Sequence, residues 1–468
     1  MLLGFALAQA LPLLATPLLT RLFSPEAFGL QTLFVSSASV LLAFATLRLD
    51  LAAVLSADRR EAVQIASLAA LQTCLVAIVI LIAAAIFGRG LAAATGHAHQ
   101  VAWIWALAPM VMVLAVAQVG TGLLTWLKRF GPASQAQVVN QVGYLGAAIG
   151  LGSWAALSEG LVVAKLVGQA VAAAVLIYLL RGILKELRLP PTPDWPRLWA
   201  RCRPFVIFNT PYSLVGVLGR EVPIFAFSAV AATAAAGHYG LARMLLGAPA
   251  TLLAASLSQV FYREAAEHRG TQRLQALTAA LLGVTLRSTA PVLALIMVWG
   301  DTAFAIAFGE DWVTAGRYAM ILALPAWLQI QTAWPERLYE SVARQGVSFS
   351  IQLSFDLLAA LCVFGAVLSG APAYVAVITF ATINSTFHLV YLVGMFRVAA
   401  FPLALLARAL GGGVAVFGLS ILLSGGLRLL PLSPLAALFC ASVIALSACA
   451  VLGLRGYRSI LAHTAAPA

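Results

Sequence analysis

An arginine and an aspartate lie two positions apart in the apolar stretch FATLRLDLAAVL, residues 44–55. In a helix, side chains two positions apart point in directions about 200° apart, so Arg48 and Asp50 do not readily pair with each other. Either charge would cost about 2.5–3.5 kcal/mol if it faced lipid at the centre of a bilayer. Each group therefore needs a separate partner or a water-filled cavity, although Arg48 is close enough to the expected helix end to extend to the membrane surface instead.

Other charged side chains lie at a similar depth in further apolar segments. Arg220 and Glu221 are adjacent, while Arg243, Arg287 and Asp356 each lie about eight residues inside an expected helix. The arginines outnumber the acids, and the planar donors of arginine fit phosphate and carboxylate groups. These residues predict a basic cavity for an anionic ligand, and ion pairs between helices are the structural alternative.

The composition indicates which elements must position these charges. Of 468 residues, 62% are hydrophobic and only 9% are charged, whereas a soluble chain carries about a quarter charged residues. Apolar runs of about 20 residues, the length that crosses a bilayer as a helix, recur along the chain. We predict an all-α polytopic membrane protein with about 14 transmembrane helices. The expected helices cover residues 2–20, 28–56, 63–87, 101–127, 137–157, 160–180, 204–230, 235–262, 279–308, 314–338, 349–369, 373–396, 404–424 and 434–454.

The basic residues in the loops predict the orientation of the chain. Eighteen Lys and Arg residues lie in one set of loops, and only four, Arg21, Arg89, Arg317 and Arg428, lie in the other. Cytoplasmic loops carry the excess of basic residues. We therefore expect a multi-pass protein of the bacterial inner membrane with both termini in the cytoplasm. The net charge of +12 then reflects orientation and predicts no nucleic-acid partner.

The longest polar connection predicts how the helices are grouped. Residues 181–203 are rich in prolines and charges, as expected for a cytoplasmic linker. The fold that we expect is two pseudo-symmetric six-helix bundles around a central cavity, plus two C-terminal helices. The bundles cover residues 1–180 and 204–396, and residues 397–468 hold the two extra helices and a cytoplasmic tail. A short internal match, FGL at 28–30 and YGL at 239–241, supports two parallel repeats.

Motifs for enzymatic or metal chemistry are weak. The other polar loops are short, and the sequence contains no GxxxxGK[ST] motif, so we expect neither a soluble catalytic domain nor an ATPase site. His97 and His99 lack a third ligand, and the five cysteines have no metal-binding spacing. We expect no catalytic residue, no metal and no cofactor.

Several motifs in the same order resemble a known family. Residues 19–55 hold the pattern Arg-Leu-aromatic, Pro-Glu-x-Phe-Gly and Leu-Arg-x-acid-x-Ala, and further matches are AAGHYGLARMLLGAP (235–249), SQVFYREAAE (258–267) and FGEDWVTAGRYA (308–319). Over residues 1–400 the chain resembles the polysaccharide repeat-unit flippases, for O-antigen or exopolysaccharide, of the multidrug/oligosaccharidyl-lipid/polysaccharide exporter superfamily. The residues that match the first pattern are Arg21, Pro25, Glu26, Phe28, Gly29, Arg48, Asp50 and Ala52.

The resemblance implies a substrate and a mechanism. An undecaprenyl-diphosphate-linked oligosaccharide is moved from the cytoplasmic to the periplasmic leaflet by alternating access, for synthesis of O-antigen, capsule or exopolysaccharide. We expect Arg48, Arg220, Arg243 and Arg287 to bind its head group while the polyprenyl tail stays in lipid. Asp50, Glu221 and Asp356 are candidates for coupling transport to a proton or sodium ion. Membrane lipids, a polysaccharide polymerase and glycosyltransferases are the expected partners.

Three alternatives remain open on the sequence alone. A drug or cation antiporter of the same superfamily predicts a cavity with net negative charge, opposite to the one inferred here. A peptidoglycan-precursor flippase shares the basic cavity and differs only in its substrate. A polysaccharide polymerase or ligase would need a sizeable outer loop, whereas the outer loops are short.

Overall fold

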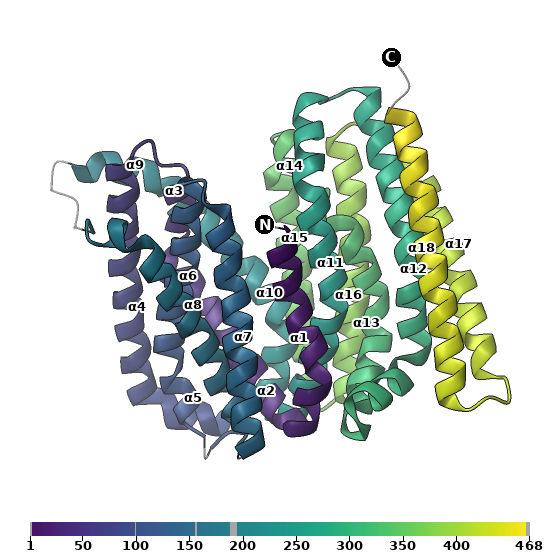
Figure 1. Ribbon diagram of the computed structural model, residues 1–468, viewed down its shortest axis with the longest axis horizontal. Helices are drawn as coiled ribbons and strands as arrows, with labels where there is room; N and C mark the ends of the chain where they lie inside the picture. The colour runs from purple at the N-terminus through teal and green to yellow at the C-terminus, as the bar shows by residue number, and fades with distance from the viewer. Residues whose placement is uncertain (1, 99, 155–156, 188–193, 465–468) are drawn as a thin grey trace. The chain divides into compact units, whose positions relative to one another are not determined.

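The computed structural model describes residues 2–98, 100–154, 157–187 and 194–464, and in this part of the chain every regular element is a helix (Figure 1). Each of the expected helical ranges overlaps a helix in these residues. Ten of the described helices are long and apolar enough to cross a membrane. The prediction of an all-α, multi-pass protein is confirmed, and the total of 14 spans stays a prediction.

The chain divides into two compact units, residues 1–240 and residues 241–468, called unit 1 and unit 2 below. Their boundary falls inside one long helix, α11. The helices of unit 1 are α1 (Leu2–Leu22), α2 (Pro25–Thr46), α3 (Leu49–Val54), α4 (Arg59–Ala94), α5 (Ala102–Trp105), α6 (Leu107–Trp126), α7 (Phe130–Trp154), α8 (Gly160–Leu184), α9 (Trp195–Pro204), the π-helix η2 (Phe205–Asn209), α10 (Thr210–Ala229) and the start of α11 (Thr233–Glu267). Those of unit 2 are the rest of α11, α12 (Gln272–Phe308), the short 3₁₀ helix η3 (Glu310–Trp312), α13 (Val313–Ala333), α14 (Leu338–Ser341), α15 (Gln345–Leu368), α16 (Ala373–Val398), α17 (Leu403–Arg428) and α18 (Pro434–Thr464).

The predicted linker, residues 181–203, contains a helix of its own. Its described part comprises the end of α8, the residues after it up to 187, and α9 from Trp195 onward. Residues 188–193 lie outside the described part of the chain. The predicted division of the chain into bundles at this linker stays a prediction.

The single helix predicted over residues 28–56 is wrong. Helix α2 ends at Thr46, α3 begins at Leu49, and the two residues between them have left-handed backbone angles, with φ of 46° at Leu47 and 54° at Arg48. A left-handed residue cannot continue a right-handed helix, and outside glycine it is uncommon because Cβ crowds the backbone. Arg48 therefore precedes a separate short helix, and the angle expected between it and Asp50 from a continuous helix does not apply.

The motif SPEAFG at residues 24–29 has a clear local role at the start of α2. Ser24 is the N-cap and its hydroxyl oxygen accepts from the amide of Ala27 at 3.4 Å, Pro25 occupies the first turn, and Glu26 places a negative charge at the positive end of the helix. Gly29 lets the helix approach another closely, because a Cβ there would lie 2.0 Å from the Thr233 carbonyl oxygen. The motif thus starts α2 and packs it against the start of α11.

The internal match between residues 28–30 and 239–241 has a packing basis. Gly29 on α2 and Gly240 on α11 both lie at this helix contact, since a Cβ on Gly240 would lie 2.5 Å from the Thr32 hydroxyl oxygen. Gly237 adds to the contact, because a Cβ there would lie 1.9 Å from the Pro25 carbonyl oxygen. The two similar segments pack against each other through small residues, which is how membrane helices make close contacts.

Candidate functional site

In unit 1, the arginine and aspartate at the α2–α3 break do not pair with each other. Asp50 on α3 is only 7% exposed, and Arg48 is half-buried. The Nε atom of Arg48 and the Oδ1 atom of Asp50 have no hydrogen-bond partner among the described residues. Buried polar atoms are nearly always paired in native proteins, so both atoms are available to a water molecule, an ion or a ligand.

The second candidate pair of unit 1 is Arg220 and Glu221 on α10, and the two side chains lie in different environments. Glu221 is buried, and its Oε2 accepts a hydrogen bond of 2.6 Å from the Ser36 hydroxyl on α2. Arg220, the preceding residue, is exposed. Neighbouring residues of a helix point about 100° apart, which explains how one side chain faces α2 while the other does not. The structure therefore joins Glu221 to α2 and leaves Arg220 on a different face of α10.

The backbone around this pair is irregular. The π-helix η2 precedes α10, and Pro223 lies within α10, two positions after Glu221. Because proline has no N–H, the carbonyl of Gly219 loses its usual partner four residues along the helix. π-helical turns and prolines are the usual causes of helix bends, and π-helical turns are frequent at functional sites. Pro223 is visible in the sequence, whereas no sequence pattern gave a sign of the π-helix.

The candidate residues of unit 2 lie on three helices. Arg243 on α11 and Asp356 on α15 are half-buried, and Arg287 on α12 is exposed. The guanidinium of Arg287 lies against α17, because a Cβ on Gly412 would be 3.0 Å from its Nε atom. The candidate set is thus shared between the two units, and its assignment to head-group binding or ion coupling stays a prediction.

Neutral polar side chains form contacts that the sequence analysis missed. In unit 1, Gln31 on α2 donates to the Tyr144 hydroxyl at 2.9 Å and to the Leu161 carbonyl at 3.4 Å, and the Lys165 ammonium lies 4.7 Å from the centre of the Tyr144 ring. These contacts join α2, α7 and α8. In the sequence, Gln31 is an uncharged polar residue inside an apolar run. Such a residue also needs a hydrogen-bond partner when it is buried, but it stands out less clearly than a charged residue.

Unit 2 holds a comparable group around Gln331 on α13, which is fully buried. Its Oε1 accepts from the Thr285 hydroxyl at 2.6 Å, and its amide donates to the Trp327 carbonyl at 3.1 Å. Nearby, the Thr332 hydroxyl and the Nδ1 atom of His388 lie 2.9 Å apart. His388, which the sequence places deep in a helix, is therefore a hydrogen-bonded residue between α13 and α16.

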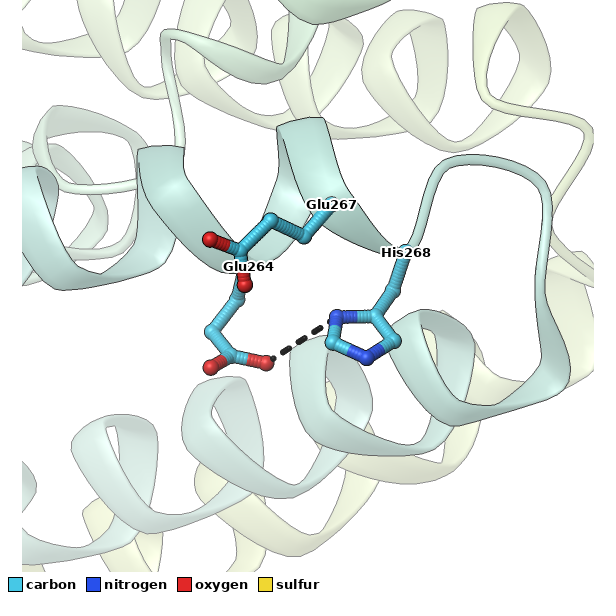
Figure 2. A group of neighbouring side chains, drawn as sticks. All are labelled: Glu264, Glu267 and His268. Atoms are coloured by element: carbon cyan, nitrogen blue, oxygen red, sulfur yellow. Dashed lines mark ion pairs between the residues drawn. The ribbon is translucent and has the colours of Figure 1, made fainter.

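One group of side chains at the end of α11 has the composition of a metal site. Glu264, Glu267 and His268 present ligand atoms that all lie within 4.8 Å of one another (Figure 2). Glu264 already makes an ion pair with His268 at 3.3 Å, and Glu267 makes one with Arg263 at 2.8 Å. Partly exposed pairs at this helical spacing are ordinary surface contacts. We therefore assign no metal to this group.

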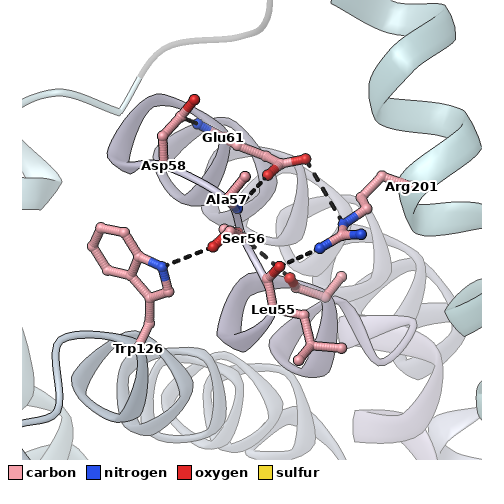
Figure 3. Close-up of polar contacts among 8 residues, drawn as sticks. Leu55, Ser56, Ala57, Asp58, Glu61, Trp126 and Arg201 are labelled. Atoms are coloured by element: carbon pink, nitrogen blue, oxygen red, sulfur yellow. Dashed lines mark hydrogen bonds and ion pairs between the residues drawn. The ribbon is translucent and has the colours of Figure 1, made fainter.

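The start of α4 binds the C-terminal side of the predicted linker. Asp58 is the N-cap, its Oδ1 accepting from the Glu61 amide at 2.8 Å, while Glu61 accepts from the Ala57 amide at 2.6 Å (Figure 3). Arg201 on α9 lies 3.8 Å from Glu61 and donates to the Leu55 carbonyl at the end of α3. These bonds hold α9 against the loop between α3 and α4.

The two sides of residues 188–193 are fixed to the same helix. Glu186 accepts from Arg59 at 2.7 Å, and Asp194 accepts from Arg60 at 2.8 Å and from Gln64 at 2.7 Å. The Arg59 hydrogen bond lowers the pKa of Glu186, and the Gln64 hydrogen bond is the largest cause that lowers the pKa of Asp194. Both carboxylates are therefore ionised and paired at neutral pH, and α4 organises the linker.

The chain is similar to known proteins in sequence and in fold. Residues 18–317 match the model of a family described as polysaccharide biosynthesis protein. A lipid II flippase, MurJ, in an inward closed conformation aligns with 98% of this chain and 99% of its own, at a TM-score of 0.75 and 12% identity. An inward-facing multidrug resistance MATE family transporter of the MOP superfamily aligns with 86% of this chain and 95% of its own, at a TM-score of 0.60 and 16% identity. No curated protein matches, and at these identities the two structures show a shared fold.

Proposed function

Because the chain belongs to the polysaccharide biosynthesis protein family, we propose that it is a flippase for undecaprenyl-diphosphate-linked oligosaccharide repeat units. It moves the saccharide from the cytoplasmic to the periplasmic leaflet of the bacterial inner membrane by alternating access. A polysaccharide polymerase and glycosyltransferases are its proposed partners on either side of this step. The observation that most supports this proposal is that the family match, residues 18–317, includes all four candidate arginines.

The chemistry of the chain supports an anionic substrate. Arg48, Arg220, Arg243 and Arg287 lie within apolar helices or at a break between them. A diphosphate accepts the paired N–H donors of guanidinium groups, and the hydrocarbon tail can remain in lipid. The acids Asp50, Glu221 and Asp356 are the proposed carriers of a coupling ion, and the partnerless Oδ1 of Asp50 makes it the first to test.

Two related functions share this fold. Export of organic cations is the alternative suggested by the similarity to the multidrug resistance transporter, but a surplus of arginines repels cations. Flipping of a peptidoglycan precursor is suggested by the similarity to the lipid II flippase, and it would use the same diphosphate contacts. The family match favours polysaccharide synthesis over both.

The test is translocation of a fluorescent undecaprenyl-diphosphate oligosaccharide in proteoliposomes. We expect the wild type to move the probe and Arg48→Ala and Arg220→Ala to lose at least tenfold in rate. Arg89→Ala, an exposed arginine near the end of α4, is the matched control and should keep the wild-type rate. Efflux of an organic cation without movement of the lipid would overturn the proposal in favour of the antiporter. Equal rates for lipid II and the oligosaccharide lipid would favour the peptidoglycan alternative.

A further inference from the structure

Four connections at one end of unit 1 line a half-open pocket of about 190 Å³. Its polar lining comes from Glu26 at the start of α2, His97 and Gln100 between α4 and α5, Ser158 before α8, and Thr233 at the start of α11. Figure 1 shows α5 at the opposite end of unit 1 from α9. The distribution of basic residues predicts that this end faces the periplasm. We call this pocket the outer-loop pocket.

Two polar atoms of the lining have no partner among the described residues. His97 is only 7% exposed, yet its Nδ1 atom makes no hydrogen bond there. The Oε1 atom of Gln100 is also unpartnered, although the amide nitrogen of the same side chain donates to the Ser158 hydroxyl. Leaving a buried polar group without a hydrogen bond costs about 1–3 kcal/mol. Such groups at a pocket wall indicate a ligand or water molecules inside it.

A third unpartnered atom lies beside the pocket. Trp103 on α5 is 2% exposed, and its indole N–H has no hydrogen-bond partner in the described part of the chain. Its ring lies edge-on to that of His97, with 6.4 Å between the ring centres. Among the described residues between His97 and Trp103, three buried polar atoms are therefore unsatisfied, which is more than ordinary packing leaves in one place.

The shape of the pocket depends on a close contact between two loops. Gly96 has a φ of +79°, and a Cβ there would lie 2.8 Å from the Cβ of Ala231. This left-handed residue turns the chain after α4 and brings His97 next to the loop that precedes Thr233. The polar groups of the pocket are therefore positioned by backbone geometry, and not only by flexible side chains.

The lining is suited to a neutral ligand rich in hydroxyl groups. Burial lowers the pKa of His97 below its ordinary value, and the nearby Thr95 carbonyl offsets this only in part, so the ring is neutral and offers one donor and one acceptor. The Gln100 carbonyl oxygen accepts, and the Ser158 and Thr233 hydroxyls can do both. This mixture matches the hydroxyl groups of a sugar.

Size and charge exclude two other classes of ligand. The space is about a dozen times what one water molecule needs, which is far more than a single bound cation fills. The lining includes the carboxylate of Glu26 and neither lysine nor arginine, so it does not attract a diphosphate. A sugar ring fits both the size and the charge of the pocket.

We propose that the outer-loop pocket binds a sugar residue of the translocated saccharide after it reaches the periplasmic side. This proposal rests on the proposed function and adds a second point of contact, separate from the arginines that are expected to hold the diphosphate. Contact through neutral hydrogen bonds selects for the saccharide, whereas contact with the diphosphate alone does not distinguish one lipid-linked sugar from another.

The test uses the full chain in lipid nanodiscs and neutral soluble monosaccharides, namely glucose, galactose, N-acetylglucosamine and N-acetylgalactosamine. Saturation-transfer NMR reports binding. We expect at least one sugar to bind, and Gln100→Met and His97→Phe to raise its dissociation constant about threefold to tenfold, the effect of one or two lost hydrogen bonds. His268→Phe, a matched change outside the pocket, should bind like the wild type. Binding of none of the sugars, or equal binding by wild type and pocket variants, would overturn the proposal.

A competition experiment identifies the source of the sugar. An undecaprenyl-diphosphate-linked oligosaccharide added to the nanodiscs should displace the bound monosaccharide. Persistence of the monosaccharide signal would mean that the pocket takes only free sugars, against the proposal. Gln100→Met changes a half-buried side chain and decides the outcome if His97→Phe does not fold.

The translocation assay in proteoliposomes separates this inference from the proposed function. Translocation by a wild type that binds no sugar leaves the flippase standing and removes the pocket as a sugar site. Sugar binding by a wild type that moves no lipid-linked oligosaccharide removes the flippase instead.

Discussion

Single polar contacts decide how the candidate residues are oriented. Glu221 faces α2 because Ser36 donates to it at 2.6 Å, and its neighbour Arg220 lies on an exposed face. A hydrogen bond to a carboxylate away from water is stronger than a neutral one. The bond between α2 and α10 therefore fixes both residues at once, the acid directly and the arginine through the helix.

Removing the donor should be measurable as a loss of stability. We expect Ser36→Ala to lower the free energy of unfolding by about 1.5–3 kcal/mol, the range for a hydrogen bond to a charged group. Unfolding in detergent, followed by tryptophan fluorescence, measures it. The control is Ser39→Ala, because Ser39 lies on the same helix and donates only to the Val35 carbonyl within it. Equal losses for the two variants would contradict the role of the bond to Glu221.

The sequence predicted which charged residues to examine but not their surroundings. Arg48, Asp50, Arg220 and Glu221 stand out because charge is costly in an apolar segment. Glu221, for example, accepts a hydrogen bond from Ser36, and a serine in a helix gives no sign of what it will face. The contacts come from packing between distant segments, which no local pattern encodes.

At the scale of elements, the positions of the helices could be predicted from the sequence, but the break within one of them could not. Apolar runs of membrane length identified the helices, since the bilayer sets that length. The break at Leu47 and Arg48 was missed because neither residue is a glycine or a proline, the usual signals of a break. Tertiary packing around α3 stabilises a backbone conformation that the local sequence disfavours.

The break between α2 and α3 predicts whether glycine or alanine is the more stabilising substitution at each position. At Arg48, with φ of 54°, Arg48→Gly should be more stable than Arg48→Ala by about 1 kcal/mol, because glycine has no Cβ to oppose the left-handed conformation. At Leu51, inside α3, the order should reverse, with glycine less stable by about 0.5–1 kcal/mol. Thermal unfolding of the four variants provides the comparison. If alanine is the more stable residue at both positions, α2 and α3 form one helix.

At the scale of the whole molecule, the family and the fold class were predictable. The ordered motifs between residues 19 and 319 indicated polysaccharide repeat-unit flippases, and the family match over residues 18–317 and the fold shared with MurJ and a MATE transporter confirm that resemblance. The outer-loop pocket was not predicted, because its residues come from four connections that are far apart in the sequence, from Glu26 to Thr233. Only the fold brings them together.

Orientation in the membrane links the linker, the pocket and the direction of transport. The eighteen basic residues of one set of loops, against four in the other, predict cytoplasmic termini. A fluorescent protein fused after residue 468 should therefore fluoresce, and alkaline phosphatase in the same place should be inactive. Phosphatase inserted after Ser433, between α17 and α18, should be active, because that connection belongs to the opposite set.

The reverse pattern would place α9 and the linker in the periplasm and the outer-loop pocket in the cytoplasm. The pocket would then meet the saccharide before translocation, and its proposed role as a contact after translocation would be excluded.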